Sequence, residues 1–549
     1  MNGVTAIAKI LQQEGVEWIG CMPSNPLIEA AAAAGIRPIV CRQERTGVHM
    51  ADGFSRINSG RRIGVFLMQA GPGAENAFGG VAQAFADSVP ILLLPAGANR
   101  DRLGVPPTFS PTRSYETITK WSAQINLASR IPELMRRAFT TLRSGRPGPV
   151  LLEIPSDVAD ETIDDAALAY EPPPVIRGAA DPDAIRRAAR ALLAAERPII
   201  HAGQGVLYAG ATEELVQLAE FLQAPVMTTL PGKSAFPEHH PLSVGTGSRA
   251  TTAGVHHFLR RADLVCGVGC SFAKSAFAVP IPAGKTLVHA TNDADDLNKD
   301  YPCRYPLVGD AKLVLTQLLD ELRRQAGTAQ RPADQALIEE IRTVKASWLQ
   351  QWLPKLTSDE VPINPYRVIW DLMHTVDLDN VIVTHESGSV REQIMPFWEA
   401  RQPHSFIGWG KSTQLGYSLG LAMGAKLAAP DRQVVHLMGD AAFGMVGMDI
   451  ETAVRAQIPV LTIILNNATM AIYPDSRFPV AAKRYQLKKL SGNFAGVAQA
   501  LGAYSERLDK PHEIVPAVRR ALDATNAGQP AVLEVMIKEE GAASTFRFH

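Results

Sequence analysis

The sequence is poor in cysteine, has no long apolar run and carries almost no net charge. Five cysteines occur in 549 residues, and such a sparse, odd-numbered set suits a reducing cytosol better than a disulfide framework. No window reaches the ~18 uninterrupted apolar residues of a membrane-spanning helix. The N-terminal stretch lacks the charged and apolar regions of a signal peptide. We therefore expect a cytoplasmic protein.

The charge balance also limits the class of partner. The formal net charge is −1, and no domain-wide basic excess or polybasic run suggests binding to nucleic acid or to an anionic membrane. Apolar residues make up 46% of the chain, so we expect a large buried core divided among roughly three to four domains. A small-molecule substrate is the partner that these features leave open.

Three blocks of the chain share one pattern, in which short apolar runs alternate with helical stretches. IGVFLM and VPILLLP in the first block, ADLVCGVG in the second and RQVVHLMGD in the third predict buried strands. This alternation favours parallel sheets covered by helices on both faces. We predict an α/β fold of three doubly wound domains, over residues 1–165, 184–325 and 360–537, with a linker at 170–183 and a tail at 538–549.

The segment MGDAAFGM, residues 438–445, lies between two predicted strands, VVHLM and VLTIILNN, with a helix predicted over GMDIETAVRAQ. Such a βαβ unit crosses over right-handed and pairs its strands in parallel. Asp440 and Asn467 then lie at the carboxyl ends of parallel strands, where open α/β sheets bind ligands. A carboxylate and an amide are oxygen ligands that suit Mg²⁺.

The residues around Asp440 are small. Gly439, Ala441 and Ala442 have little bulk, so the backbone N–H groups at the start of the helix can approach a phosphate. The motif therefore predicts a site for a metal and a diphosphate. The alternative is an ordinary strand-to-helix turn followed by a polar turn at Asn467.

The sequence resembles the thiamine-diphosphate-dependent family of acetolactate synthase, pyruvate oxidase, benzoylformate decarboxylase and oxalyl-CoA decarboxylase. The family pattern GDG…NN is GDA…NN here, with Ala441 in place of the last glycine. CRQERTGVHMADGFSR, MQAGPGAENAFGGVAQAFADSVPILLL and GWGKSTQLGYSLGLAMGAKLAAPDRQVV also resemble family segments, so the similarity covers nearly the whole chain. It implies pyrimidine-binding, middle and diphosphate-binding domains, in that order.

The resemblance implies roles for individual residues. Glu44 would hydrogen-bond the aminopyrimidine ring of thiamine diphosphate from a neighbouring subunit and relay the proton that activates the cofactor; the alternative is an ordinary acid at a helix start. Leu415 would wedge the cofactor into its bent shape, and Thr413 would accept a hydrogen bond on its backbone. The other implied contacts are Gly388, Ser389, Gly439, Ala441 and Ala442 with the diphosphate, and Asp440, Asn467 and the Thr469 carbonyl with Mg²⁺.

The side of the site that faces substrate is less defined. Gln69 is a catalytic candidate, and residues 21–26 and 108–116 face the reacting carbon in relatives. The paired histidines of pyruvate decarboxylases, the histidine of benzoylformate decarboxylases near Gln69 and the glutamine-tryptophan segment of acetolactate synthases have no counterpart here. The resemblance implies C–C bond cleavage or formation through an acyl-anion (enamine) intermediate.

Two subdivisions of that chemistry stay open. The first is a 2-oxo-acid decarboxylase or carboligase similar to acetolactate synthase. The second is a 2-hydroxyacyl-CoA lyase or an enzyme similar to oxalyl-CoA decarboxylase, which a basic segment after Asn467 favours. A solvated charged face is the simpler interpretation of that segment. Its basic residues are Arg477, Lys483, Arg484, Lys488 and Lys489.

The resemblance further implies a homodimer or homotetramer with the active site at the subunit interface. In relatives the middle domain holds a flavin, an adenine nucleotide or nothing, and we expect no catalytic role for it here. GQGVLYAG in that domain lacks the full dinucleotide fingerprint, and Cys266 and Cys270 have no second ligand pair for zinc. A non-catalytic scaffold on the same fold and a nicotinamide dehydrogenase are the rival classes.

Overall fold

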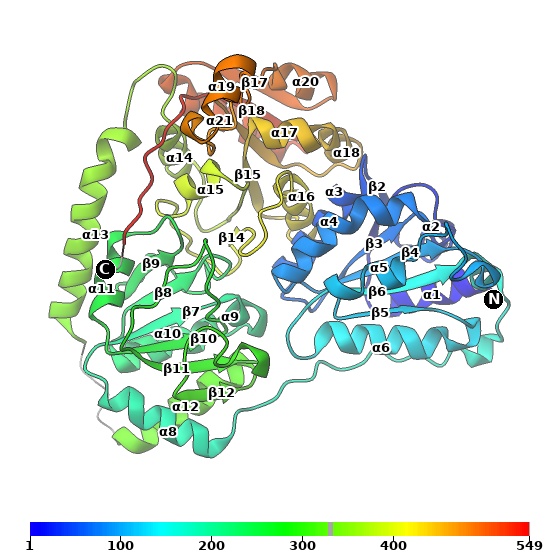
Figure 1. Cartoon of the computed structure of the whole chain (residues 1–549), viewed down its shortest axis with the longest axis horizontal. Coiled ribbons are helices and arrows are strands. Elements are labelled where there is room, and N and C mark those ends of the chain that lie inside the picture. The colour runs from blue at the N-terminus through cyan, green and yellow to red at the C-terminus, as the bar shows by residue number, and fades with distance from the viewer. Residues whose placement is uncertain (328–332, 548–549) are drawn as a thin grey trace.

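The computed structural model describes residues 1–327 and 333–547. Within them the strands form three six-stranded sheets in which neighbouring strands are parallel (Figure 1). The predicted α/β class with doubly wound parallel sheets is confirmed. The exact domain boundaries stay predictions, because sheets mark where the cores lie and not where domains end.

The strand order shows how each sheet is wound. The first sheet runs β2 (Arg37–Val40), β1 (Trp18–Cys21), β3 (Gly64–Met68), β4 (Ile91–Gly97), β6 (Val150–Pro155), β5 (Trp121–Gln124). The second runs β12 (Tyr305–Val308), β11 (Thr286–Thr291), β10 (Leu264–Val268), β7 (Pro198–Ala202), β8 (Val226–Thr229), β9 (Ser243–Gly247). The third runs β14 (Phe406–Ile407), β13 (Val381–His385), β15 (Gln433–Gly439), β16 (Leu461–Asn466), β18 (Ala531–Met536), β17 (Tyr504–Leu508).

Helices cover both faces of the first sheet. Successive residues of a strand point to opposite faces, and in β3 Val65 and Leu67 join one core while Phe66 and Met68 join the other. The first core contains α1 (Gly3–Gln13) and α6 (Ile131–Arg143), and the second contains α3 (Glu44–Ile57) and α4 (Pro72–Ala86). Because both faces of the sheet are buried, the sequence of β3 is a continuous apolar run.

Most of the other helices pack around the sheets in the same way. Those of the middle domain are α8 (Pro182–Ala194), α9 (Gln204–Ala209), α10 (Thr212–Leu222), α11 (Ala253–Arg261) and α12 (Ala311–Ala326). Those of the last domain are α14 (Pro365–Met373), α15 (Ser389–Ile394), α16 (Ser418–Ala428), α17 (Asp440–Val446), α18 (Ile450–Arg455), α20 (Phe494–Ala500) and α21 (Ile514–Asn526). The shorter α2 (Leu27–Ala33), α5 (Pro111–Ser114) and α7 (Ser156–Asp160) belong to the first domain.

The crossover between β15 and β16 differs from the sequence prediction in one detail. The sequence predicts its helix over GMDIETAVRAQ, but the helix starts directly at Asp440 with α17 and resumes as α18 after a 3₁₀ turn at Gly447–Asp449. Compact residues allow the chain to turn into a helix immediately after the strand. Asp440 therefore sits on the first turn of a helix and not in a loop before it.

The first and last domains are in close contact through α3 and α16, which lie side by side (Figure 1). Glycines permit this approach. A Cβ added at Gly424 would lie 2.0 Å from the Met50 carbonyl oxygen, and one at Gly53 would lie 2.2 Å from that of Leu421. The two helices therefore meet backbone to backbone.

The long helix α13 (Gln335–Leu356) leads from the middle domain to the last one, and the tail after β18 runs back along it (Figure 1). Trp348 on α13 donates to Ser544 Oγ over 2.9 Å, and Ser544 Oγ donates to the Thr251 carbonyl over 2.6 Å. The tail thus ties the last domain to the middle one. Among the described residues, no helix is both long and apolar enough to cross a membrane.

Gly424→Ala should loosen the contact between α3 and α16, because its methyl group has no space beside the Met50 carbonyl. We expect a loss of stability of about 1–3 kcal/mol, as for an overpacked core, measured as a lower midpoint of urea unfolding. Gly178→Ala is the matched control, since a Cβ at Gly178 meets nothing within 4 Å. Equal midpoints for the two variants would contradict the close packing.

Candidate active site

Three neighbouring strands of the last sheet deliver the predicted diphosphate and metal residues to one edge. β13, β15 and β16 are adjacent and parallel, so their carboxyl ends coincide. Gly388 and Ser389 follow β13, Asp440 follows β15, and Asn467 follows β16. The structure therefore brings together residues that lie up to 79 positions apart in the sequence (467 − 388).

Asp440 is the buried acid of this edge. Asp440 is only 3% exposed. Its Oδ1 accepts the Ala441 N–H over 2.9 Å, and its Oδ2 is buried with no hydrogen-bond partner. Burial raises the pKa of this carboxyl, and backbone N–H groups, including those of Ala468 and Thr469, act against that shift. The Asp440 carboxylate thus faces the turn that follows Asn467.

The turn after β16 presents further oxygens. Asn467 Oδ1 accepts the Thr469 N–H over 3.1 Å, and a carbonyl oxygen of this kind has a second lone pair. Ala468 between them has a left-handed backbone, with φ of 54°, which makes the turn sharp. An unpartnered carboxylate oxygen beside an amide oxygen and a backbone carbonyl fits a hard cation such as Mg²⁺. Among the described residues, no cluster of three His, Cys, Asp or Glu offers an alternative metal centre.

The small residues of the edge leave room for a diphosphate. A Cβ at Gly439 would meet nothing within 4 Å, and one at Gly388, whose φ is 80°, would only reach Ile472 Cδ1 at 4.0 Å. Ala441 is half-buried and Ala442 is buried on the first turn of α17. Space in front of these backbones is what close approach of a phosphate requires.

The predicted ring-binding residues lie on residues 408–417, which connect β14 to α16 and are named here the cofactor loop. Thr413 is exposed and Leu415 is half-buried against the core beneath it. The position of Leu415 is consistent with a side chain that has one face on the core and one face towards a ligand.

The first domain holds the other half of the predicted set. Glu44 begins α3 and is 5% exposed, and Asn76 Nδ2 donates to its Oε2 over 3.3 Å. Gln69 follows β3, and a Cβ at Gly73 would lie 2.8 Å from Gln69 Cβ and 3.5 Å from Glu44 Oε1. The structure therefore brings Glu44 and Gln69 to the same helix start. Burial, with the Glu44 charge nearby, raises the pKa of Tyr115.

The other predicted substrate segments lie around the same sheet edge. Residues 21–26 begin at the last residue of β1, and there Asn25 donates to the carbonyls of Met68 and Leu94 over 3.1 and 3.0 Å. Tyr115, in residues 108–116, donates to the Ala74 carbonyl. Sequence reasoning did not single out Asn25, although an asparagine between serine and proline signals a constrained turn.

The Glu44 side chain is not hydrogen-bonded to the last domain's half of the set within the described chain. None of the hydrogen bonds or ion pairs found in residues 1–327 and 333–547 connects Glu44 with the cofactor loop or with Asp440. The neighbours of Glu44 do reach the last domain: Gln43 Nε2 donates to the Met445 carbonyl over 3.0 Å, and the Arg42 N–H donates to Asp449 over 2.8 Å. Glu44 itself faces α4.

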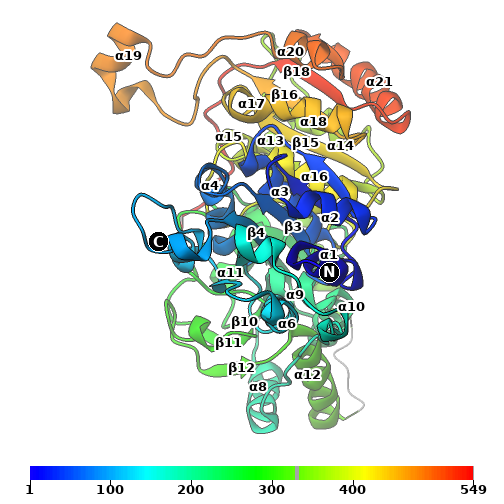
Figure 2. The same ribbon diagram turned by 90° about the vertical axis from the view of Figure 1, so that its right-hand side faces the viewer.

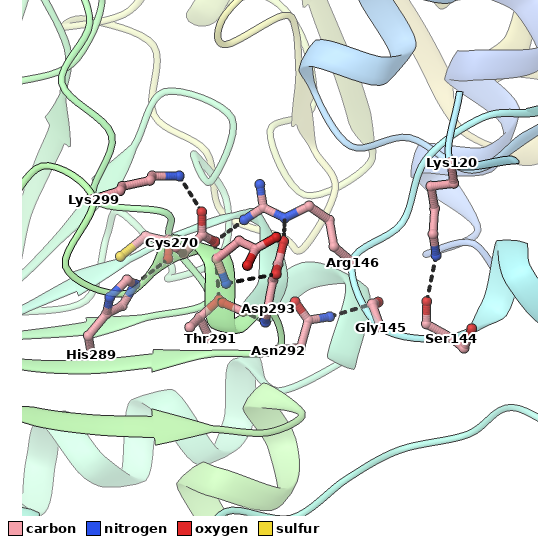
Figure 3. Close-up of polar contacts among 12 residues, drawn as sticks. Lys120, Ser144, Gly145, Arg146, Cys270, His289, Thr291, Asn292, Asp293 and Lys299 are labelled. Atoms are coloured by element: carbon pink, nitrogen blue, oxygen red, sulfur yellow. Dashed lines mark hydrogen bonds and ion pairs between the residues drawn. The ribbon is translucent and has the colours of Figure 1, made fainter. Parts of the chain in front are cut away.

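A separate cavity of about 480 Å³ lies between the three domains. Gln204 and Gly205 of the GQGVLYAG stretch line it, as do Arg146 and Lys411. Figure 3 shows Arg146 paired with Asp293, over 2.9 Å, on one side of this region, with Lys299 nearby. None of the predicted catalytic or cofactor residues lines the cavity.

Comparison with known proteins identifies the family of each of the three domains. Three family models match: the thiamine pyrophosphate enzyme N-terminal TPP binding domain at residues 1–122, the central domain at 185–318 and the C-terminal TPP binding domain at 386–535. A probable acetolactate synthase large subunit of Methanocaldococcus jannaschii is 31% identical over 98% of this chain and 92% of its own length.

Two further relatives are similar over most of their length. Glyoxylate carboligase of Escherichia coli O157:H7 is 29% identical over 98% of this chain and 93% of its own length. The acetolactate synthase isozyme 3 large subunit of Escherichia coli K12 is 27% identical over 98% and 95%.

Asp440→Ala removes the unpartnered carboxylate oxygen of the candidate metal site. We expect Mg²⁺-dependent binding of thiamine diphosphate, measured by calorimetry, to weaken by at least ~100-fold, the upper end of what loss of a supporting residue costs. Asp431→Ala is the control, because Asp431 is exposed just before the opposite end of β15. Unchanged affinity in Asp440→Ala would remove this residue from the metal site.

Proposed function

The chain belongs to the thiamine pyrophosphate enzyme family, and on that premise we propose that it makes or breaks a carbon–carbon bond next to the carbonyl of a small 2-oxo acid. The observation that carries the proposal is the buried, unpartnered Asp440 oxygen beside the Asn467 turn. The names of the relatives, acetolactate synthase and glyoxylate carboligase, support decarboxylation or carboligation of a 2-oxo acid.

The cofactor, when bound, supplies a nucleophilic carbon and an electron sink. The chain's own residues bind and orient it. Asp440, Asn467 and the Thr469 carbonyl hold Mg²⁺, while Leu415 and the Thr413 backbone position the rings. The residues that accommodate the diphosphate are Gly388, Ser389, Gly439, Ala441 and Ala442.

Glu44 provides the proton-transfer group. Its carboxyl group is buried and is placed to hold or donate a proton at the aminopyrimidine ring. Gln69, which meets Glu44 at Gly73, is then the second polar side chain that this domain offers to the substrate. The side chains of both residues lie where α4 begins, so one helix start positions the catalytic pair.

We further propose that Glu44 acts in the site of a second copy, within a homodimer or homotetramer. The orientation of Glu44 in one chain supports this, because among the described residues its carboxylate is hydrogen-bonded to Asn76 on α4 and not to the last domain's site. Exposed apolar side chains are available for such an interface: Phe78 and Phe85 on α4 are 38% and 42% exposed, and Met445 and Met448 near α17 are 45% and 51% exposed.

The five free cysteines support a reducing cytosol as the location of the protein.

One observation favours the alternative substrate, an acyl-CoA thioester. Residues 470–489, named here the basic arm, contain α19 (Pro479–Tyr485) and project from the last domain (Figure 2). Lys483 and Arg484 on it are exposed. The arm starts at the candidate metal site, because Thr469 Oγ1 and the Met470 N–H both donate to the Lys488 carbonyl, over 3.2 and 2.8 Å. Its charges could therefore receive an anionic substrate tail.

Glu44→Gln keeps the shape of the side chain and removes its ability to transfer a proton. We expect turnover to fall ~10²–10⁴-fold, the usual contribution of a general acid–base group, with cofactor affinity nearly unchanged. Glu75→Gln is the control, since Glu75 is an exposed acid in the first turn of α4. Full activity in Glu44→Gln would show that Glu44 is not the proton-transfer group.

The shared site can be tested with mixed copies. A hybrid dimer of one Glu44→Gln copy and one Asp440→Ala copy contains one site with both residues intact and one site with neither, if the site spans two copies. The hybrid, isolated with two different tags, should recover about half of wild-type activity, as two-fold symmetry requires. A hybrid as inactive as its two parents would place both residues in one chain's site.

The substrate class is tested by product analysis. Holoenzyme incubated separately with pyruvate, glyoxylate, oxalyl-CoA and a 2-hydroxyacyl-CoA should convert a 2-oxo acid, with products identified by mass spectrometry. The variant Lys483→Glu, Arg484→Glu should then keep wild-type kcat/KM, because a small acid does not need the basic arm. Exclusive turnover of a CoA thioester, lost in that variant, would establish the alternative.

A further inference from the structure

The cofactor loop is held at its start by an acid from another domain. The N–H groups of Gly410 and Lys411 donate to the Asp87 carboxylate, Gly410 over 2.9 Å to Oδ2 and Lys411 over 2.9 Å to Oδ1. Asp87 caps α4 of the first domain and is 4% exposed. Two consecutive backbone groups of the loop are therefore fixed by one buried carboxylate that lies more than 300 residues earlier in the chain.

The Asp87 carboxylate is itself rigidly placed. Arg56 Nη2 donates to it over 3.1 Å and Gln83 Nε2 over 2.9 Å. Arg56 is paired with Asp52 as well, over 2.6 Å, and its Nη1 donates to the Gly408 carbonyl over 2.9 Å. A buried carboxylate with this many donors is held in one orientation, and each charge-assisted bond is stronger than a neutral one.

The far end of the loop is held by a second buried carboxylate. Glu386, directly after β13, accepts the Gly416 N–H over 3.2 Å and the Ser418 hydroxyl over 2.7 Å on the same oxygen. Its other oxygen accepts the Ser387 N–H over 2.8 Å. Glu386 is fully buried, and it belongs to the same strand end as Gly388.

The middle of the loop also touches the first domain. Gln414 Oε1 is hydrogen-bonded to His49 Nε2 over 3.0 Å. Gly79 on α4 makes room for this side chain, because a Cβ there would lie 2.2 Å from Gln414 Nε2. Thr413 and Leu415 flank Gln414, so both ring-binding candidates lie between fixed points.

We propose that Asp87 is a positioning residue, which with Glu386 clamps the cofactor loop at both ends and so sets where Thr413 and Leu415 meet the cofactor. Asp87 touches neither substrate nor cofactor in this arrangement. It acts through two backbone N–H groups, and the first domain thereby contributes to cofactor binding within its own chain, apart from what Glu44 does. The link to the cofactor rests on the proposed function, whereas the clamp itself is a property of the protein alone.

Asp87→Asn tests the clamp. An asparagine side chain has one acceptor oxygen where aspartate has two, so it can accept from only one of the two N–H groups in this geometry. Its NH₂ group would face the other donor. In enzyme free of cofactor, hydrogen exchange at Gly410 and Lys411, followed by mass spectrometry of the peptide that spans the loop, should be at least tenfold faster than in the wild type. The dissociation constant for thiamine diphosphate should rise about tenfold, equivalent to about 1.4 kcal/mol.

Asp52→Asn is the matched control. Asp52 is as buried as Asp87 and shares Arg56 with it, but it makes no hydrogen bond to the loop. We expect exchange at Gly410 and Lys411, and affinity for the cofactor, to remain near wild-type values in this variant. Equal acceleration in both variants would mean general loosening of α3 and would overturn the assignment.

Glu386→Gln tests the clamp independently at the other end of the loop. It remains informative even if Asp87→Asn does not fold. It should accelerate exchange at Gly416 and Ser418 and weaken cofactor binding, with protection at Gly410 kept. Unchanged exchange in the variants, or faster exchange with unchanged cofactor affinity, would overturn the proposal. If wild-type protein bound no thiamine diphosphate, the proposed function would fail, while the exchange data would still show whether the clamp exists.

Discussion

The candidate site depends on one constraint: three parallel strands end side by side at the same edge of the last sheet. β13, β15 and β16 are adjacent in the last sheet, and parallel pairing forces the segments after them to one edge. Asp440 is therefore buried against the Asn467 turn, with one carboxylate oxygen left without a partner. A buried, unpartnered carboxylate oxygen is costly in a folded protein, and a bound cation removes that cost. The same edge carries the small residues that leave space for a diphosphate.

Helix α3 of the first domain makes two kinds of contact: one with the cofactor loop of its own chain and one, through Glu44, with α4. Its backbone packs directly on α16 of its own chain, and its side chains His49 and Arg56 reach the cofactor loop. Glu44, at the start of the same helix, instead faces α4. One helix thus supports the cofactor loop of its own chain, while Glu44, the proposed catalytic acid, lies against a different helix. This division supports our proposal that a complete site forms between two copies.

The periodic parts of the fold could be predicted from sequence, and the long-range contacts could not. Continuous apolar runs such as β3 and β15 mark strands buried on both faces, and the βαβ pattern was enough to place Asp440 and Asn467 at one edge of a sheet. The start of the helix at Asp440 was missed, since small residues give no helical periodicity. Asp87, Glu386 and Gly79 were missed for another reason: their roles arise from partners in distant segments, and no local pattern distinguishes a clamping carboxylate from a helix-capping one.

The cavity between the domains illustrates the same limit of sequence-based prediction, because its wall combines Arg146, Gln204 and Lys411 from three separate blocks.

The central claim, that Asp440 and Asn467 hold the metal of a bound diphosphate, is tested most directly by a crystal structure with thiamine diphosphate and Mn²⁺ in place of Mg²⁺. The account predicts one anomalous peak ligated by both side chains, the Thr469 carbonyl and the diphosphate. A bound cofactor whose metal is ligated by other residues, with Asp440 and Asn467 turned away, would contradict it.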